Sequence, residues 1–189
     1  MYSRIILLVS ALLVSSVTSA EEVNIQLGSD TARFMYLTEA FGQDFGRLEL
    51  EAGFLYNKND NANDSSLVNV GLLVRGESIS VPMIVSIGAR AYVAKLGTYD
   101  VAAIAIGGDL LLVPESWGGL GAGFYYYTAP GVVAFSDAEG LSEFGAYVNF
   151  QLTPQARIAV GYQEINVSIK NAADVRLDKG AYFGLNLSF

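Results

Sequence analysis

The chain has 189 residues, no cysteine and no histidine, and its 19 acidic and 11 basic side chains give a net charge of −8 at pH 7. This length suits one domain with a sizeable core. The acidic balance argues against a nucleic-acid partner. Without cysteine or histidine the chain has no disulfide, no thiolate or imidazole metal site and no serine-hydrolase triad. We therefore expect no metal and no cofactor.

Residues 1–20 have the pattern of a secretory signal peptide. Arg4 supplies a positive charge, residues 5–17 are apolar, and a small-residue site ends at Ala20, directly before Glu21 and Glu22. The apolar run is roughly 13 residues, short of the roughly 20 that a spanning helix needs, so a retained anchor is the weaker alternative. We expect cleavage after Ala20 and a single domain over residues 21–189.

Apolar residues recur at every second position along this domain, which predicts strands. A short alternation covers 23–27 and a second segment covers 33–41. Eight clear strands follow, around 47–56, 68–74, 83–93, 102–112, 120–126, 144–152, 156–162 and 180–189. The first count is ten strands, and eight is the alternative if the first two segments form a plug or cap. In "YQEINVSI", residues 162–169, the apolar phase slips by one position. The slip predicts a bulge, or the point where the strand leaves its apolar surroundings.

The two faces of these strands differ in an unusual way. One face is continuously apolar, whereas the other is poor in charge and carries a glycine near the middle of each clear strand. Recurrent glycine indicates a narrow interior in which backbones approach closely or large side chains crowd a small, strongly curved sheet, with scattered bulges as the alternative. A soluble sandwich or lipocalin-like barrel would turn its polar faces to water. The inverted arrangement predicts a transmembrane antiparallel up-and-down β-barrel, apolar to lipid and polar inside.

The connections between strands alternate in length. Thr153-Pro154-Gln155 and residues 113–116 are short, whereas residues 57–66, about 128–140 and 170–178 form longer polar segments. Outer-membrane barrels have short periplasmic turns and longer extracellular loops. We therefore expect both ends of the domain on the periplasmic side. The acidic segment 57–66 lacks the ligand spacing of a calcium loop.

Several stretches resemble the YfaZ family of small bacterial outer-membrane proteins. They are "GARAYVAKLGTYDVAAIAIGGDL", "YYYTAPGVVAFSDAEGLSEFGAYVNFQLTPQARIAVGYQEI" and "ADVRLDKGAYFGLNLSF". The resemblance covers most of residues 21–189 and implies a barrel in the outer membrane of a Gram-negative bacterium. It implies no molecular function.

The last strand is similar to the C-terminal signature of barrels that are delivered to the outer-membrane assembly machinery. Phe189 ends the chain, and Leu187, Leu185 and Phe183 alternate before it. An ordinary amphipathic strand that ends in phenylalanine is the alternative. The expected partners are this machinery and the lipid and lipopolysaccharide of the outer membrane, and we expect a monomer.

Charged residues fall on the polar faces of four consecutive strands: Glu49, Glu51, Arg75, Arg90 and Asp109. Charges in a narrow lumen are costly unless they are paired, and guanidinium and carboxylate groups can pair across adjacent strands. We expect an ion-pair network in the lumen, which would act as a structural plug or as a conduction gate.

The resulting hypothesis is a non-enzymatic outer-membrane barrel, either a narrow porin-like channel or a membrane protein that acts through its loops without conductance. A membrane-embedded hydrolase or acyltransferase is the alternative from another class. The missing histidine and cysteine count against it, although serine with aspartate or lysine stays open. A soluble lipocalin-like binder is the third hypothesis.

Overall fold

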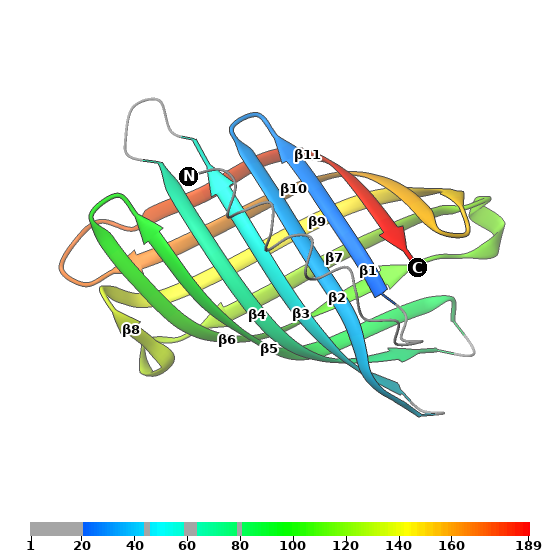
Figure 1. Ribbon diagram of the computed structural model, residues 1–189, viewed down its shortest axis with the longest axis horizontal. Coiled ribbons are helices and arrows are strands. Elements are labelled where there is room, and N and C mark those ends of the chain that lie inside the picture. Colours follow the sequence, from blue (N-terminus) through cyan, green and yellow to red (C-terminus); the bar gives the residue numbers. More distant parts are fainter. Residues whose placement is uncertain (1–20, 44–45, 59–63, 79–80) are drawn as a thin grey trace, which may run out of the picture.

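The computed structural model describes residues 21–43, 46–58, 64–78 and 81–189, and the expected signal peptide lies outside these ranges. Ten long antiparallel strands form the wall of a barrel (Figure 1). They are β1 (Glu21–Gly28), β2 (Thr31–Gln43), β3 (Gly46–Asn57), β4 (Ser65–Glu77), β5 (Met83–Leu96), β6 (Tyr99–Leu112), β7 (Leu120–Ala129), β9 (Ala138–Thr153), β10 (Ala156–Ile169) and β11 (Val175–Ser188).

The ring is closed by the first and last strands. β1 pairs antiparallel with β11, from Glu22 opposite Ser188 to Gly28 opposite Tyr182. The backbones of Glu21 and Phe189 exchange two further hydrogen bonds. The expected count of ten strands is therefore confirmed, and the first two predicted segments complete the ring instead of plugging it. Closure leaves no unpaired edge strand to face lipid.

Three short elements occupy the connections. The 3₁₀ turn η1 (Glu115–Trp117) lies between β6 and β7. The 3₁₀ turn η2 (Gly131–Val133) and β8 (Ala134–Ser136) lie between β7 and β9, and β8 pairs with the start of β6. Within the described ranges, no helix is long and apolar enough to cross a membrane.

The two ends of the barrel differ in their connections. The end that holds Glu21 and Phe189 is called the terminal end below, and it lies to the right in Figure 1. The opposite, distal end carries the longest connection, residues 130–137. It also carries the tight turn between β5 and β6, where Gly97 has a φ of 60°. Glycine suits this positive φ because it has no Cβ. By the prediction from turn lengths, the terminal end faces the periplasm.

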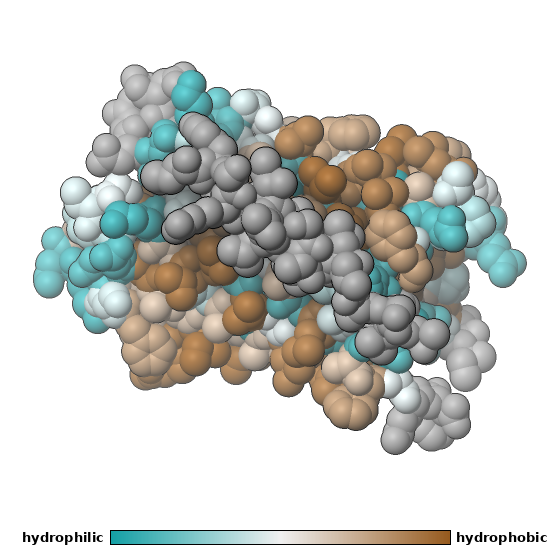
Figure 2. Space-filling model, in the orientation of Figure 1, coloured by the Kyte–Doolittle hydropathy of each residue, from teal (hydrophilic) through white to brown (hydrophobic). Residues whose placement is uncertain are grey.

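The outer surface of the wall is an apolar band. Figure 2 shows large apolar areas on one face, between hydrophilic side chains that gather toward its two ends. The exposed positions follow the predicted alternation, which fits a strand that contacts lipid on one side only. Large apolar side chains exposed in this band include Leu50, Phe54, Val70, Leu72, Ile87, Val93, Ile104, Ile106, Phe124, Phe144, Val148, Val160 and Phe183.

Tyrosines fill the interior opposite the predicted glycines. Tyr125 lies beside Gly145, and Tyr147 lies beside Gly123, each pair facing across β7 and β9. A Cβ added to either glycine would meet the ring of its partner. Tyr182 lies in the same way over Gly161 of β10. These three glycines make room for large side chains, whereas Gly88 and Gly107 lie closest to the backbone of the neighbouring strand, so both readings of the glycine pattern occur.

The phase slip in residues 162–169 has two structural counterparts. The pairing of β10 with β11 shifts register between Ile165 and Asn166, so Leu177 and Asp178 of β11 are both buried. Along β10 the inward positions stay odd throughout. The register is thus irregular at the predicted place, but the extra residue belongs to β11 and not to residues 162–169. The apolar phase changes because the inward side chains become apolar from Ile165 onward.

Candidate functional site

The interior of the barrel contains a buried ion-paired layer near its middle, centred on Arg90. Arg90 Nη2 lies 2.7 Å from Glu51 Oε2 and 3.7 Å from Asp109 Oδ1. Its guanidinium stacks over the ring of Tyr127, with Cζ 3.7 Å from the centroid, and the Tyr127 hydroxyl donates to Asp109 at 2.5 Å. Asn69 Nδ2 donates to the second oxygen of Glu51 at 2.6 Å. The charges of this group are therefore compensated by near neighbours, as burial requires.

A second arginine completes this layer from the other side of the lumen. Arg33 of β2 donates from Nη1 to Glu143 Oε1 of β9 at 2.6 Å, and both side chains are almost fully buried. Tyr92 donates to the other Glu143 oxygen at 2.5 Å, and Arg90 Nη1 lies 3.7 Å from it. Glu143 thus connects three strands across the barrel. The central layer is defined here as Arg33, Glu51, Arg90, Asp109 and Glu143 with Tyr92 and Tyr127.

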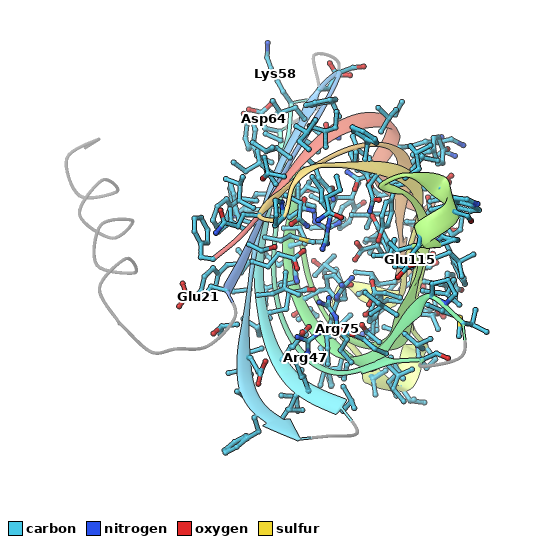
Figure 3. All side chains as sticks on the ribbon, turned by 90° about the vertical axis from the view of Figure 1, so that its right-hand side faces the viewer. Glu21, Arg47, Lys58, Asp64, Arg75 and Glu115 are labelled. Carbon is cyan, nitrogen blue, oxygen red and sulfur yellow. The ribbon has the colours of Figure 1, made fainter. Side chains whose placement is uncertain are left out.

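A polar cavity of about 310 Å³, called the vestibule below, lies between the central layer and the terminal end. Arg75 of β4 holds Glu49 at 3.2 Å and Glu22 at 3.8 Å. Nearer the mouth, Arg47 of β3 pairs with Glu77 at 2.5 Å. Figure 3 looks at the terminal end and shows Arg47 and Arg75, which are cross-strand partners, near this mouth. The opposite wall presents tyrosine and amide side chains, including Tyr147, Asn149, Tyr182 and Asn186.

The distal half of the lumen is filled by apolar side chains, called the distal layer below. Leu55 and Leu67 face each other across β3 and β4 and are completely buried. Ile165 and Val167 of β10 are equally buried. Side chains without solvent contact leave no water-filled path beside them. Other members of this layer are Ala94, Leu96, Val101, Ala103, Ala129, Ala138, Leu141, Ile169 and Leu177.

One carboxylate is buried at the distal end without an arginine. Asp178 accepts hydrogen bonds from Thr31 Oγ1 at 2.6 Å and from Gln163 Nε2 at 2.6 Å. Asn57 Nδ2 donates to it at 3.2 Å. Three neutral donors therefore satisfy this carboxylate, and the group joins β2, β3, β10 and β11 around the bulge in β11.

The five charged residues predicted for the lumen all face the interior, but their contacts divide them into two groups. Glu51, Arg90 and Asp109 lie in the central layer. Glu49 and Arg75 lie in the vestibule. Sequence reasoning missed Arg33 and Glu143, which make the most buried pair. Glu143 shares the odd phase of Gly145 and Tyr147, and this phase was the signal that could have identified it.

The four residues predicted to form the assembly signal lie on β11 and at the C-terminus. Phe183 faces outward and is half exposed, and Phe189 is largely exposed at the terminal end. Leu185 and Leu187 pair with Ile25 and Val23 of β1. Their recognition by the assembly machinery stays a prediction.

Engineered cysteines should distinguish the vestibule from the distal layer, because the chain has no cysteine of its own. Leu111 lines the vestibule, whereas Ala103, on the same inward face of β6, is buried in the distal layer. We expect a membrane-impermeant thiol reagent to modify Leu111→Cys readily and Ala103→Cys very slowly, as followed by mass spectrometry of the folded barrel. Comparable rates at both positions would mean that water fills the whole lumen.

Comparisons with known proteins identify one family. A family model described as YfaZ precursor matches residues 3–189. No curated protein matches the chain. Similar solved structures include one described as "Unveiling the Mechanism Behind the in-meso Crystallization of Membrane Proteins", at 13% identity and a TM-score of 0.44, over 90% of this chain and 83% of the other. A second is the outer membrane channel DcaP of Acinetobacter baumannii, at 14% identity and a TM-score of 0.40, over 90% of this chain and 62% of the other. With TM-scores below 0.5, neither likeness carries an argument.

Proposed function

The chain belongs to the YfaZ family of outer-membrane β-barrels, and from this premise we propose that it is a non-enzymatic barrel whose lumen is closed in the resting state. Solutes could enter the vestibule from the periplasmic side, but they could not pass through the barrel. The observation that carries this proposal is that two layers of largely buried side chains, the ion-paired central layer and the apolar distal layer, lie between the vestibule and the distal end.

The chemistry of the two layers supports closure for different reasons. Ions do not enter the distal layer readily, because its apolar side chains offer no groups to replace the water that an ion must shed. The central layer is rigid because each of its arginines is held by at least one carboxylate, and Arg90 is also stacked on Tyr127. Opening a path would require both layers to rearrange. A structural plug is therefore favoured over a gate that depends on ion pairs alone.

The buried carboxylates also support a non-enzymatic role. Glu51 and Glu143 each bind an arginine and a further side-chain donor, and Asp178 is held by neutral donors. A general acid or base needs access to a reacting group, and carboxylates saturated in this way lack it. The hydrolase or acyltransferase hypothesis gains no support from this interior.

The cellular setting is part of the same proposal. We infer that a signal peptide is removed after Ala20, that the last strand is recognised by the outer-membrane assembly machinery, and that the barrel resides as a monomer in lipid and lipopolysaccharide. The apolar band around the wall supports the contact with lipid.

Closure can be tested by electrical recording in planar lipid bilayers. We expect no steady unitary current from the wild-type barrel at either polarity, with an unrelated general porin as the positive control. Arg90→Ala should unfold more easily, because Glu51 and Asp109 lose their shared cation, yet should remain silent because the distal layer is intact. Steady unitary current in the wild type would refute the closed lumen. Current in Arg90→Ala alone would restore the gate hypothesis.

A further inference from the structure

Arg157 of β10 differs from the other arginines that line the vestibule. Arg33 pairs with Glu143, Arg47 with Glu77, and Arg75 with Glu49, and Arg90 is held in the central layer. Arg157 makes no ion pair or side-chain hydrogen bond with any residue in the part of the chain that the structure describes. It is half-buried near the terminal end and faces the cavity. A cation in this position is free to hold an anionic group that enters from the mouth.

Buried hydrogen-bond acceptors without donors lie on the wall next to it. They are Asn186 Oδ1 of β11, and Asn24 Oδ1 and Gln26 Oε1 of β1. Asn186 is the cross-strand partner of both Arg157 and Asn24. Its amide nitrogen donates to the Glu22 carboxylate, which fixes the amide oxygen as the free acceptor. These three acceptors require N–H or O–H donors. The Glu22 carboxylate lies beside them, with the Arg75 guanidinium 3.8 Å away.

The total charge of the lining narrows the class of ligand. Seven acidic residues and five arginines line the vestibule. Because acidic residues outnumber arginines, the lining disfavours binding of a solute with only a negative charge. The unpaired Arg157 disfavours binding of a solute with only a positive charge. A solute that carries both charges satisfies both sides. Only β11 lies between β10 and β1, so Arg157 and Glu22 are on strands about 10 Å apart. Both side chains point into the lumen, which can shorten the distance between their charged groups to the length of a small zwitterion.

We propose that the vestibule is a binding site for small zwitterions of the amino-acid or short-peptide type. Arg157 binds the anionic group, and the Asn186 oxygen with the Glu22 carboxylate binds the ammonium. A cavity of about 310 Å³ is large enough for such a solute. Binding does not depend on whether the lumen conducts, so the closed-lumen proposal and this one can fail separately.

Calorimetric titration of the folded barrel in detergent tests this site. The probes are glycylglycine, which carries both charges, propionate, which carries only the negative one, and propylamine, which carries only the positive one. We expect saturable binding of glycylglycine and much weaker binding of the other two. Arg157→Gln should lower the affinity for glycylglycine about tenfold or more, because a charge-assisted contact is lost. Glu22→Gln should also lower the affinity for glycylglycine. The difference in affinity between glycylglycine and propionate should then become smaller.

Arg176→Gln is the matched control. Arg176 makes an ion pair with Glu164 at 3.6 Å on the exposed side of β11, away from the vestibule, so its loss should leave binding unchanged. If Arg157→Gln does not fold, the site can be tested by NMR of the wild type. Glycylglycine should change the amide chemical shifts of Arg157 and Asn186 and leave that of Val167, in the distal layer, unchanged. Absence of saturable glycylglycine binding, equal affinity for propionate, or unchanged binding in folded Arg157→Gln would each overturn the proposal.

Discussion

Replacing Glu143 by alanine is expected to destabilise the barrel more than any other single change in the lumen. Glu143 is completely buried and contacts Arg33 at 2.6 Å, Tyr92 at 2.5 Å and Arg90 at 3.7 Å. Its removal leaves the buried Arg33 guanidinium without a carboxylate partner, whereas Arg90 keeps Glu51 and Asp109. The loss in the free energy of unfolding should be about 3 to 5 kcal/mol, since an unpaired buried charge costs more than the pair contributes. Urea titration in lipid vesicles measures it.

Two further variants separate this effect from a general loss of a glutamate. Glu139→Ala changes the same residue type on the same strand, where the side chain is exposed, and should stay within about 0.5 kcal/mol of the wild type. Replacing Arg33 and Glu143 together by leucine removes both charges. This double variant should lose less stability than Glu143→Ala, because no unpaired charge remains. A Glu143→Ala barrel as stable as Glu139→Ala would show that the central layer contributes nothing to stability.

The outer face of the wall could be predicted from the sequence because lipid imposes one requirement on every outward position. Leu72, Ile104 and Val148 are apolar for the same reason, and the alternation repeats from strand to strand. The inward glycines were equally informative, since a missing side chain such as that of Gly145 signals a large neighbour, here Tyr125. The alternation of apolar residues thus predicted the strands and their faces, and the inward glycines predicted the narrow lumen.

The arrangement inside the lumen could not be predicted in the same way. An alternating pattern tells which side chains point inward, but it does not tell which of them meet across the barrel. Arg33 and Glu143 are 110 positions apart in the sequence, and only ring closure brings β2 near β9. The distal layer was missed because transmembrane barrels were expected to be polar inside, whereas Leu55 and Leu67 are inward and apolar. The phase slip before Ile165 was the one local sign of this layer.

Arginine at position 148 is expected to destabilise the barrel by a different mechanism, from the lipid side. Val148 lies at the middle of the outward apolar run from Phe144 to Leu152 on β9, faces Val160 across the ladder, and is more than half exposed on the outer surface. A charge at the bilayer midplane loses its hydration, so Val148→Arg should cost about 2 to 4 kcal/mol of unfolding free energy in vesicles.

Leu152→Arg is the control for depth, because Leu152 shares the strand and the outward face but lies next to the terminal end of β9. There the guanidinium can reach the interface, and the cost should fall to about 0 to 1 kcal/mol. The difference between the two variants depends on the bilayer, so it should shrink when the same barrels are unfolded from detergent micelles that admit water closer to the wall. Equal costs at both positions would place Val148 in water or protein contact. The apolar band would then be an interface with another molecule and not with lipid.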